Sequence, residues 1–239
     1  MFKHRLLRKL QKLHRQYQPV ITPLRILFNY AFFQKKIDRN QWEAEKDSNW
    51  EIYKNLMTWS WEETEKNAPL YFERLKISIS KAKGKVLEVG CGIGTMTRWL
   101  AESPEVDSIV AIDAFPEAID ELVRYNLPKV TPLTISVENF QLNQPALFDT
   151  VVMCEIIEHL YPDEEQNFLK GLRSYLHTET KYVISVPIGW MDDPHHVRGF
   201  SKRRFKRHLK RFYGEPIEIY YLSDYTQEAW GYFKPHNKS

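Results

Sequence analysis

A turn with three glycines decides the fold class of this chain. Gly90, Gly92 and Gly94 lie between residues 85–89, a short apolar run predicted to be a buried strand, and residues 96–103, which have the apolar period of a helix. In open α/β sheets, ligands bind at such turns because the turns lie at the carboxyl ends of the strands. Glycines there permit positive φ angles and let a ligand touch the backbone. The chain is therefore predicted to be an α/β protein with a ligand site at this turn.

The alternation of strand and helix continues after the glycine turn. Further strands are predicted at residues 108–113, 130–136, 148–154 and 181–186, and further helices at 116–125, 163–176 and 201–213. An antiparallel pair is predicted at residues 216–222 and 229–233, around a turn at 223–224. Short β-rich runs separated by helices favour a doubly wound, mostly parallel sheet, here of seven strands, with helices on both faces.

Two helical segments precede the predicted domain at residues 80–239. Residues 1–39 are expected to form a basic amphipathic extension, because apolar side chains recur at helical spacing among Lys and Arg. Residues 40–79 contain four of the seven tryptophans and are expected to form a helical cap. Its tryptophans either pack on the domain, as aromatic side chains commonly do, or form a lid over the substrate.

Positive charge is concentrated in two segments. Residues 1–37 carry nine Lys or Arg and no acidic side chain, whereas the other 202 residues carry 25 basic and 31 acidic side chains. The body of the protein is therefore not a general nucleic-acid-binding surface. Residues 1–36 either contact an anionic membrane, contact RNA or pack on the domain. Residues 202–211, with seven Lys or Arg, form either a solvated helix face or a phosphate or carboxylate contact beside the active site.

The sequence predicts neither a membrane span nor a disulfide framework. The apolar stretch at residues 20–33 is short, it is interrupted by a proline, an arginine and an asparagine, and no small-residue cleavage site follows it. Cys91 and Cys154 lie at the ends of predicted strands and are expected to be reduced thiols of the core. We therefore expect a cytoplasmic protein, with residues 1–36 as its possible peripheral membrane contact.

Two acidic residues accompany the glycine turn. Glu88 precedes it, and Asp113 ends the next strand, where a carboxylate can bind both ribose hydroxyls of an adenosine. A dinucleotide-binding fingerprint would need glycine at the position of Thr95, and a phosphate-binding P-loop would need Gly-Lys-Ser/Thr at the helix start. These absences argue against a nicotinamide-dependent dehydrogenase and against a P-loop nucleotidase.

Three segments, residues 86–94, 112–113 and 148–160, resemble the successive motifs of class I S-adenosylmethionine-dependent methyltransferases, and the resemblance covers residues 80–215. It implies that the three glycines face the methionine and ribose parts of S-adenosylmethionine. It also implies that Glu88 helps to hold the methionyl amino group and that Asp113 holds the ribose.

Residues 135–140 resemble the turn that contacts adenine in the same superfamily. Ser136 and Val137 are the candidate contacts there. Many relatives carry an acid at the position of Ser136, so the adenine amino group is expected to meet either the Ser136 hydroxyl or a nearby backbone carbonyl.

A Glu-x-x-Glu-His cluster follows the strand at residues 148–154. If the segment were helical, Glu155, Glu158 and His159 would fall within an arc of about 100°, close to the expected methyl group. Three interpretations are open. The side chains could simply hydrogen-bond the loop, His159 could act as a general base toward a substrate hydroxyl, or the cluster could bind a divalent metal.

The metal interpretation draws on a closer resemblance. Glu-x-x-Glu-His followed by a distant histidine is similar to the small-RNA 3′-terminal 2′-O-methyltransferases, and the ubiquinone-pathway O-methyltransferases carry a similar cluster. His196 is the matching histidine, so Mg²⁺ or Mn²⁺ would be held by Glu155, Glu158, His159 and His196. The same pattern also occurs in small-molecule and sugar methyltransferases that have no established metal.

These observations favour an O-methyltransferase that acts on a small molecule, a sugar or a lipid-linked acceptor. Its catalytic candidates are His159, His196 and Glu155, and Trp190 either lines the acceptor pocket or packs in the core. One alternative is a metal-dependent methyltransferase of RNA 3′ ends. Another is a cofactor-binding protein without catalysis that serves as an interaction partner.

Overall fold

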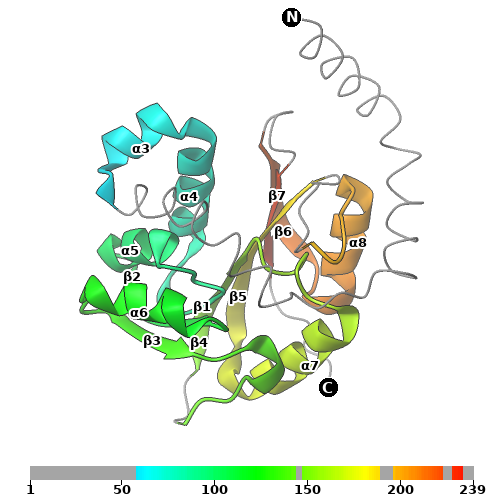
Figure 1. Ribbon diagram of the computed structural model, residues 1–239. Coiled ribbons are helices and arrows are strands. Elements are labelled where there is room, and N and C mark those ends of the chain that lie inside the picture. Colours follow the sequence, from blue (N-terminus) through cyan, green and yellow to red (C-terminus); the bar gives the residue numbers. More distant parts are fainter. Residues whose placement is uncertain (1–57, 144–146, 189–195, 223–227, 234–239) are drawn as a thin grey trace, which may run out of the picture.

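The computed structural model describes residues 58–143, 147–188, 196–222 and 228–233 (Figure 1). Its helices are α3 (Trp61–Asn67), α4 (Pro69–Lys81), α5 (Thr95–Glu102), α6 (Pro116–Arg124), α7 (Pro162–Leu172) and α8 (Lys202–Phe212). Its strands are β1 (Gly84–Val89), β2 (Val106–Asp113), β3 (Val130–Thr134), β4 (Phe148–Cys154), β5 (Leu176–Pro187), β6 (Pro216–Tyr221) and β7 (Glu228–Phe233).

The strands form one seven-stranded sheet in the order β3-β2-β1-β4-β5-β7-β6. The first five strands pair in parallel, whereas β7 runs antiparallel to both of its neighbours, β5 and β6. The predicted doubly wound sheet and its antiparallel pair are therefore confirmed. β1 and β4 are neighbours at the centre of the sheet, and the chain continues from β1 to β2 on one side and from β4 to β5 on the other. Their carboxyl ends therefore flank the crevice in which such sheets bind ligands.

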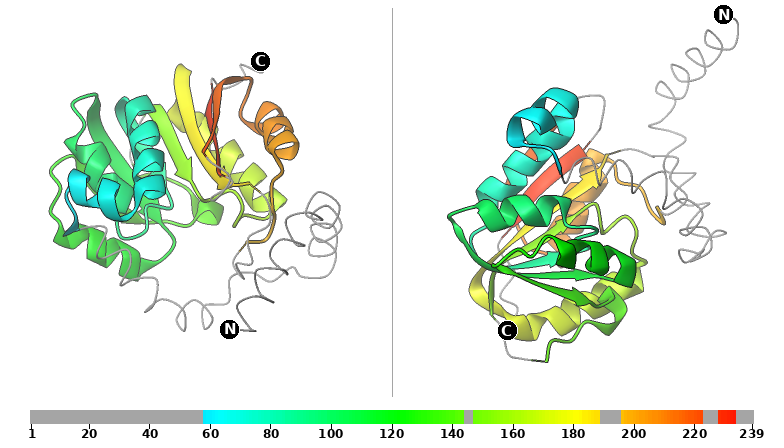
Figure 2. Two further views of the ribbon diagram at one scale, coloured as in Figure 1. Left: turned by 90° about the horizontal axis from the view of Figure 1, so that it is seen from above. Right: turned by 60° about the vertical axis from the view of Figure 1, so that its left-hand side comes forward.

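Helices cover both faces of this sheet (Figure 2). One buried cluster combines sheet residues with apolar side chains of α7 and α8, including Phe168, Leu172, Phe205 and Leu209. The other combines them with α4, α5 and α6. The central strands are apolar on both faces because each face meets a helical layer, which is why they read as near-continuous apolar runs in the sequence.

The described part of the tryptophan-rich segment packs on the domain. Trp61 of α3 stacks on Trp99 of α5, with ring centroids 4.1 Å apart, and meets the edge of Phe72 in α4. A capping box between Ser60 and Glu63 starts α3. The packing interpretation thus holds for Trp61, while the predictions for residues 1–57 lie outside the described residues.

The largest difference from the predicted element boundaries lies between α7 and β5. The helix expected at residues 163–176 ends at Leu172, and β5 begins at Leu176, before the expected start at residue 181. Thr178 and Glu179 are exposed, but Leu176 packs against the core, and Thr180 is buried and donates a hydrogen bond to the carbonyl of Phe148 at 2.6 Å. Because Thr180 is held by a hydrogen bond to a neighbouring strand, this part of β5 lacks the apolar pattern by which a buried strand is predicted from sequence.

Cys91 and Cys154 are both free thiols, as expected. No helix in the described residues has the length and apolar character that a membrane span requires.

Candidate active site

The glycine turn connects β1 to α5 at the carboxyl edge of the sheet. Gly90, Gly92 and Gly94 all have positive φ angles. The amide groups of Gly90 and Cys91 both donate to the carbonyl of Ile112 in β2, at 2.8 and 3.0 Å. The turn is therefore fastened to the neighbouring strand through its backbone.

Two of the glycines are required for different reasons. At Gly90 the φ is +70°, and a Cβ would overlap the terminal methyl group of Ile156. At Gly92 the φ is +55°, and a Cβ would meet no atom within 4 Å. Gly90 thus makes room for the turn that follows β4, whereas Gly92 leaves open space over the backbone, as a bound ligand would need.

Asp113 is fixed in place at the end of β2. One carboxylate oxygen accepts a hydrogen bond from the amide of Gly92 at 2.9 Å, and the other accepts one from the amide of Phe115 at 3.0 Å. Burial raises the pKa of this carboxyl, although the amide hydrogen bonds act in the opposite direction. The side chain predicted to hold ribose therefore lies against the glycine turn with its orientation set by the backbone.

Glu88 lies under the same turn and is almost completely buried. Burial raises its pKa to about 8. Its Oε2 atom has no hydrogen-bond partner among the described residues, and a buried carboxylate oxygen of this kind is costly unless a partner arrives. An ammonium group would supply that partner, so the site fits the amino end of S-adenosylmethionine.

The predicted adenine contacts lie after β3. Ser136 caps a short 3₁₀ turn, Val137–Asn139, and its hydroxyl accepts a hydrogen bond from the side-chain amide of Asn139 at 3.2 Å. Val137 packs against the core. Both contacts to adenine remain predictions.

The Glu-x-x-Glu-His segment is a turn and not a helix. Glu155 has a φ of +57°, which is unusual for a residue with a side chain. Its carboxylate accepts a hydrogen bond from the Ser185 hydroxyl at 2.7 Å and lies 3.8 Å from the guanidinium of Arg74. Glu155 is therefore directed to β5 and α4.

The other three members of the predicted metal set come together. Glu158, His159 and His196 each offer a ligand atom, and these atoms lie within 4.8 Å of one another. The two imidazole rings meet edge to face, with centroids 4.7 Å apart. Among the described residues, this is the group of histidines, cysteines and acids that could hold a metal ion, and Glu155 is not part of it.

The electrostatics of Glu158 fit a cation. Both of its carboxylate oxygens are buried, and neither has a hydrogen-bond partner among the described residues. Burial raises its pKa well above its usual range, and the negative charge of Glu155 raises it further. A divalent cation beside this carboxyl would offset both effects, since buried carboxylates are stabilised by pairing or by metal ligation.

Arg198 and Arg74 were not singled out from the sequence. Arg198 lies behind His196 in the same loop, and Arg74 reaches Glu155 from α4. For Arg198 the usable signal is its position two residues after the candidate ligand His196, whereas no local pattern marks Arg74. Trp190 lies outside the described residues.

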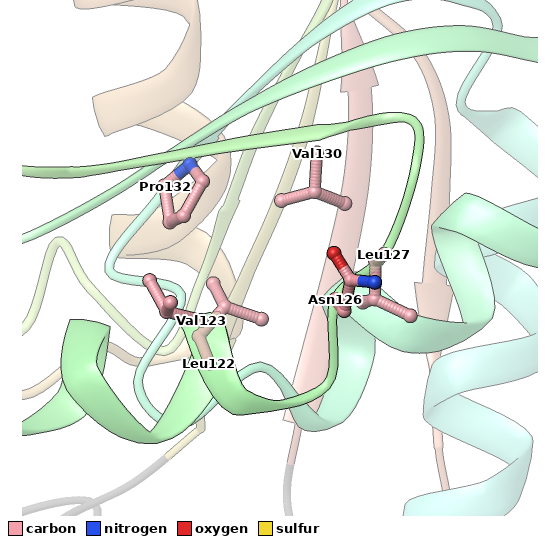
Figure 3. Close-up of a pocket in the computed structure, with 6 residues that line it drawn as sticks. All are labelled: Leu122, Val123, Asn126, Leu127, Val130 and Pro132. Carbon is pink, nitrogen blue, oxygen red and sulfur yellow. The ribbon is translucent and has the colours of Figure 1, made fainter.

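A small cavity elsewhere in the domain does not belong to this site (Figure 3). Its lining comes from the last turn of α6, the connection that follows it and the start of β3, namely Leu122, Val123, Asn126, Leu127, Val130 and Pro132. Leu122 also packs against Gly94, where a Cβ would lie 2.3 Å from its methyl group.

The basic segment at residues 202–211 is the helix α8, which packs through Phe205 and Leu209. Its seven Lys and Arg side chains fall on the remaining arc of the helix, and Lys210 pairs with Glu215 at 2.5 Å. The helix thus has a buried apolar face and a basic face, and the contact of that basic face with a phosphate or carboxylate remains a prediction.

A family model described as a methyltransferase domain matches residues 87–181, which include the glycine turn, Asp113 and the Glu158 turn. A ubiquinone biosynthesis O-methyltransferase of Rickettsia conorii is 27% identical over 172 residues, covering 64% of this chain and 53% of that protein. The chain spans about half the length of the curated relatives it matches.

Solved methyltransferase structures share the fold. The DhpI–SAH complex superimposes with a TM-score of 0.57 at 19% identity, covering 73% of this chain and 87% of that chain. The small RNA methyltransferase HEN1 gives a TM-score of 0.59 at 16% identity, covering 72% of this chain and 26% of that chain. At these identities the likeness concerns the fold alone.

The strand order, the glycine turn and the carboxylates at the ends of β1 and β2 agree with these matches. Residues 87–181 are thus similar to a methyltransferase domain, and the described residues share the fold of solved methyltransferase structures.

Proposed function

We propose that this protein is an S-adenosylmethionine-dependent O-methyltransferase of a small-molecule, sugar or lipid-linked acceptor, and that Glu158, His159 and His196 form its metal-binding acceptor site. The observation that carries the proposal is the gathering of these three side chains within 4.8 Å. The terminal methyl group of Ile156, in the same turn, lies where a Cβ of Gly90 would be. The turn that carries Glu158 and His159 therefore packs against the glycine turn.

The chemistry is an in-line displacement. An acceptor oxygen attacks the methyl carbon, the carbon–sulfur bond breaks, and the bonding electrons remain on the sulfur of S-adenosylhomocysteine. The hydroxyl proton leaves to His159, to His196 or to solvent. Alignment of donor and acceptor supplies much of the acceleration in such reactions.

A bound Mg²⁺ or Mn²⁺ would lower the pKa of the acceptor hydroxyl and orient it. The two imidazoles and the Glu158 carboxylate are a donor set that suits such an ion. The residues would hold the acceptor oxygen on the side of the crevice that carries the turn after β4, with Glu158 buried and the two histidines partly exposed. In the absence of a metal, the same histidines would serve as general bases.

The test is methyl transfer from labelled S-adenosylmethionine to a panel of hydroxylated aromatic compounds, sugars and lipid-linked phenols, before and after chelation. We expect label in one of these classes, loss with chelator, and recovery with Mg²⁺, Mn²⁺ or Co²⁺. Glu158→Gln should abolish turnover with unchanged cofactor affinity. Glu105→Gln, which removes an exposed acid at the opposite edge of the sheet, is the matched control. Turnover that is indifferent to chelator contradicts the metal site but not the methyltransferase.

RNA is the second candidate acceptor because the basic face of α8 follows the His196 loop. It predicts salt-sensitive RNA binding and loss of methylation after periodate oxidation of the terminal diol. A third candidate, a cofactor-binding protein without catalysis, predicts cofactor affinity without label in any acceptor fraction. The labelling panel distinguishes all three.

A further inference from the structure

A buried charged cluster lies directly behind the loop that carries His196. Its centre is Glu165 of α7, whose side chain is fully buried, and Arg198, whose side chain is 4% exposed. The guanidinium donates to a Glu165 oxygen at 2.6 Å. Two further donors reach the other oxygen of Glu165, namely the Tyr213 hydroxyl at 2.5 Å and the ring of His208 at 2.8 Å.

Arg198 also reaches toward the candidate active site. Its Nε donates to the carbonyl of Ile157 at 2.7 Å. The amides of Val197 and Arg198 both donate to the carbonyl of Glu158, at 3.0 and 3.2 Å. The segment after His196 is therefore bonded to the backbone of the turn that carries Glu158 and His159.

The charges in this cluster are matched. Burial alone would raise the pKa of Glu165, but the hydrogen bond from His208 and the charge of Arg198 outweigh it, so its pKa lies below the usual range. Burial lowers the pKa of His208, with Glu165 opposing. A buried ion pair of this kind is a weak source of net stability, because desolvation offsets the attraction. Its defined geometry is the more distinctive property.

We propose that Arg198 and Glu165 are positioning residues that hold His196 beside His159 and Glu158. The inference rests on the proposed function, because it assigns the support of the same site. The fork of one guanidinium bonds α7 through Glu165 and the Glu158 turn through Ile157, while the neighbouring amides fix the start of the loop. His208 and Tyr213 extend the support to α8 and the residue that follows it.

The consequence for the site is geometric. His196 comes from a loop, and a loop histidine without such support would sample several positions. Residues that orient metal ligands typically affect metal affinity 10- to 100-fold when they are replaced. Arg198 would act indirectly, through its hydrogen bonds to the backbone of the turn that carries Glu158 and His159.

The principal test is Arg198→Lys in the full chain. Lysine keeps the positive charge but cannot donate to Glu165 and Ile157 with the same planar fork. Co²⁺ is the probe, because its visible spectrum reports ligand number and geometry. We expect Co²⁺ affinity to fall about 10- to 100-fold and the spectrum to change, while S-adenosylmethionine affinity measured by calorimetry stays within about twofold.

Glu164→Ala is the matched control. Glu164 lies next to Glu165 on α7, and its carboxylate accepts a hydrogen bond from the Tyr161 amide at the helix start. Alanine removes this acceptor, so the variant should destabilise α7 without touching Arg198. It should lower the unfolding midpoint and leave the Co²⁺ spectrum unchanged. If it alters the spectrum as much as Arg198→Lys does, the positioning role is wrong and the effect is general destabilisation.

Tyr213→Phe provides a milder variant in case Arg198→Lys fails to fold. It removes one of the three donors to Glu165 and keeps the ring, and we expect a severalfold loss of Co²⁺ affinity. A Co²⁺ affinity and spectrum equal to those of the parent protein in both folded variants would overturn the proposal.

A metal-independent readout separates this proposal from the proposed function. In ¹⁵N-histidine-labelled protein, ring-to-ring nuclear Overhauser contacts between His159 and His196 should be present in the parent and lost in Arg198→Lys. If the parent binds no Co²⁺, the metal site fails, but loss of the ring contacts still supports positioning. If the contacts persist in the variant, positioning fails whatever the metal result.

Discussion

The two sides of the active-site crevice are built in different ways. The predicted contacts to the methionine and ribose parts of the cofactor come from one short stretch of chain, Glu88 to Asp113, which is held by the backbone of β1, the glycine turn and β2. The candidate acceptor side joins a turn after β4 to a loop some forty residues later, and the buried side chains of α7 and α8 support it. The cofactor side therefore depends on glycine geometry, whereas the acceptor side depends on side-chain contacts between distant segments.

The largest effect is expected where the two sides of the crevice touch, at Gly90 and Ile156. Gly90→Ala would force a side chain into a positive φ and against Ile156, and we expect a loss of unfolding free energy on the order of 2–5 kcal/mol. Gly92→Ala has the same unfavourable φ but open space around it, and should cost about 1 kcal/mol. Denaturant unfolding without cofactor measures both values. Equal losses of unfolding free energy in the two variants would show that the Ile156 side chain moves aside at little cost.

Paired substitutions should separate the two sides. Asp113→Asn should weaken S-adenosylmethionine binding roughly 10- to 100-fold, because charge-assisted hydrogen bonds to ribose are lost, and should leave Co²⁺ binding intact. His196→Ala should reduce turnover on the order of 100-fold and leave cofactor affinity intact. Calorimetry, Co²⁺ titration and initial rates are the measurements. Matching losses in both assays would show that the sides are coupled.

The pH dependence of cofactor binding should sharpen the picture of Glu88. Burial raises its pKa to about 8 in the cofactor-free protein, so an arriving ammonium group must displace a proton. Affinity should then rise with pH, by at most about tenfold per unit below pH 8, until deprotonation of the ligand's own ammonium group reverses the trend. The same shift means that Glu88 favours the folded cofactor-free state at low pH, and that this contribution is lost as pH rises from 4.5 through about 8. Glu88→Gln should remove the proton release seen by calorimetry in different buffers.

The smallest effect is expected on the basic face of α8. Lys206→Glu with Arg207→Glu should change turnover on a neutral small acceptor by less than about twofold, since both side chains are exposed. Lys66→Glu on α3 is the control. A larger loss that depends on salt would show instead that α8 contacts a phosphate or carboxylate of the acceptor, or RNA.

The same contrast explains what the sequence could predict. The glycine turn, Glu88 and Asp113 follow from local rules, because each lies at the end of an apolar strand. Glu155 was grouped with Glu158 and His159 on helical spacing, but its positive φ directs the carboxylate to Ser185 and Arg74. Arg198 and Glu165 are separated by a helix and a strand, and no local pattern encodes their pairing. Side-chain networks between distant segments need the fold before they can be read.

The place of β7 between β5 and β6 has a consequence for biosynthesis. β5 emerges from the ribosome some forty residues ahead of the strand that covers its outer edge. Until residues 228–233 arrive, a long apolar strand presents unpaired backbone groups to the cell, which is a recognised hazard for aggregation. Chaperone demand during synthesis should therefore centre on this open edge, and substitutions that weaken β7 should reduce soluble yield before they affect the folded domain.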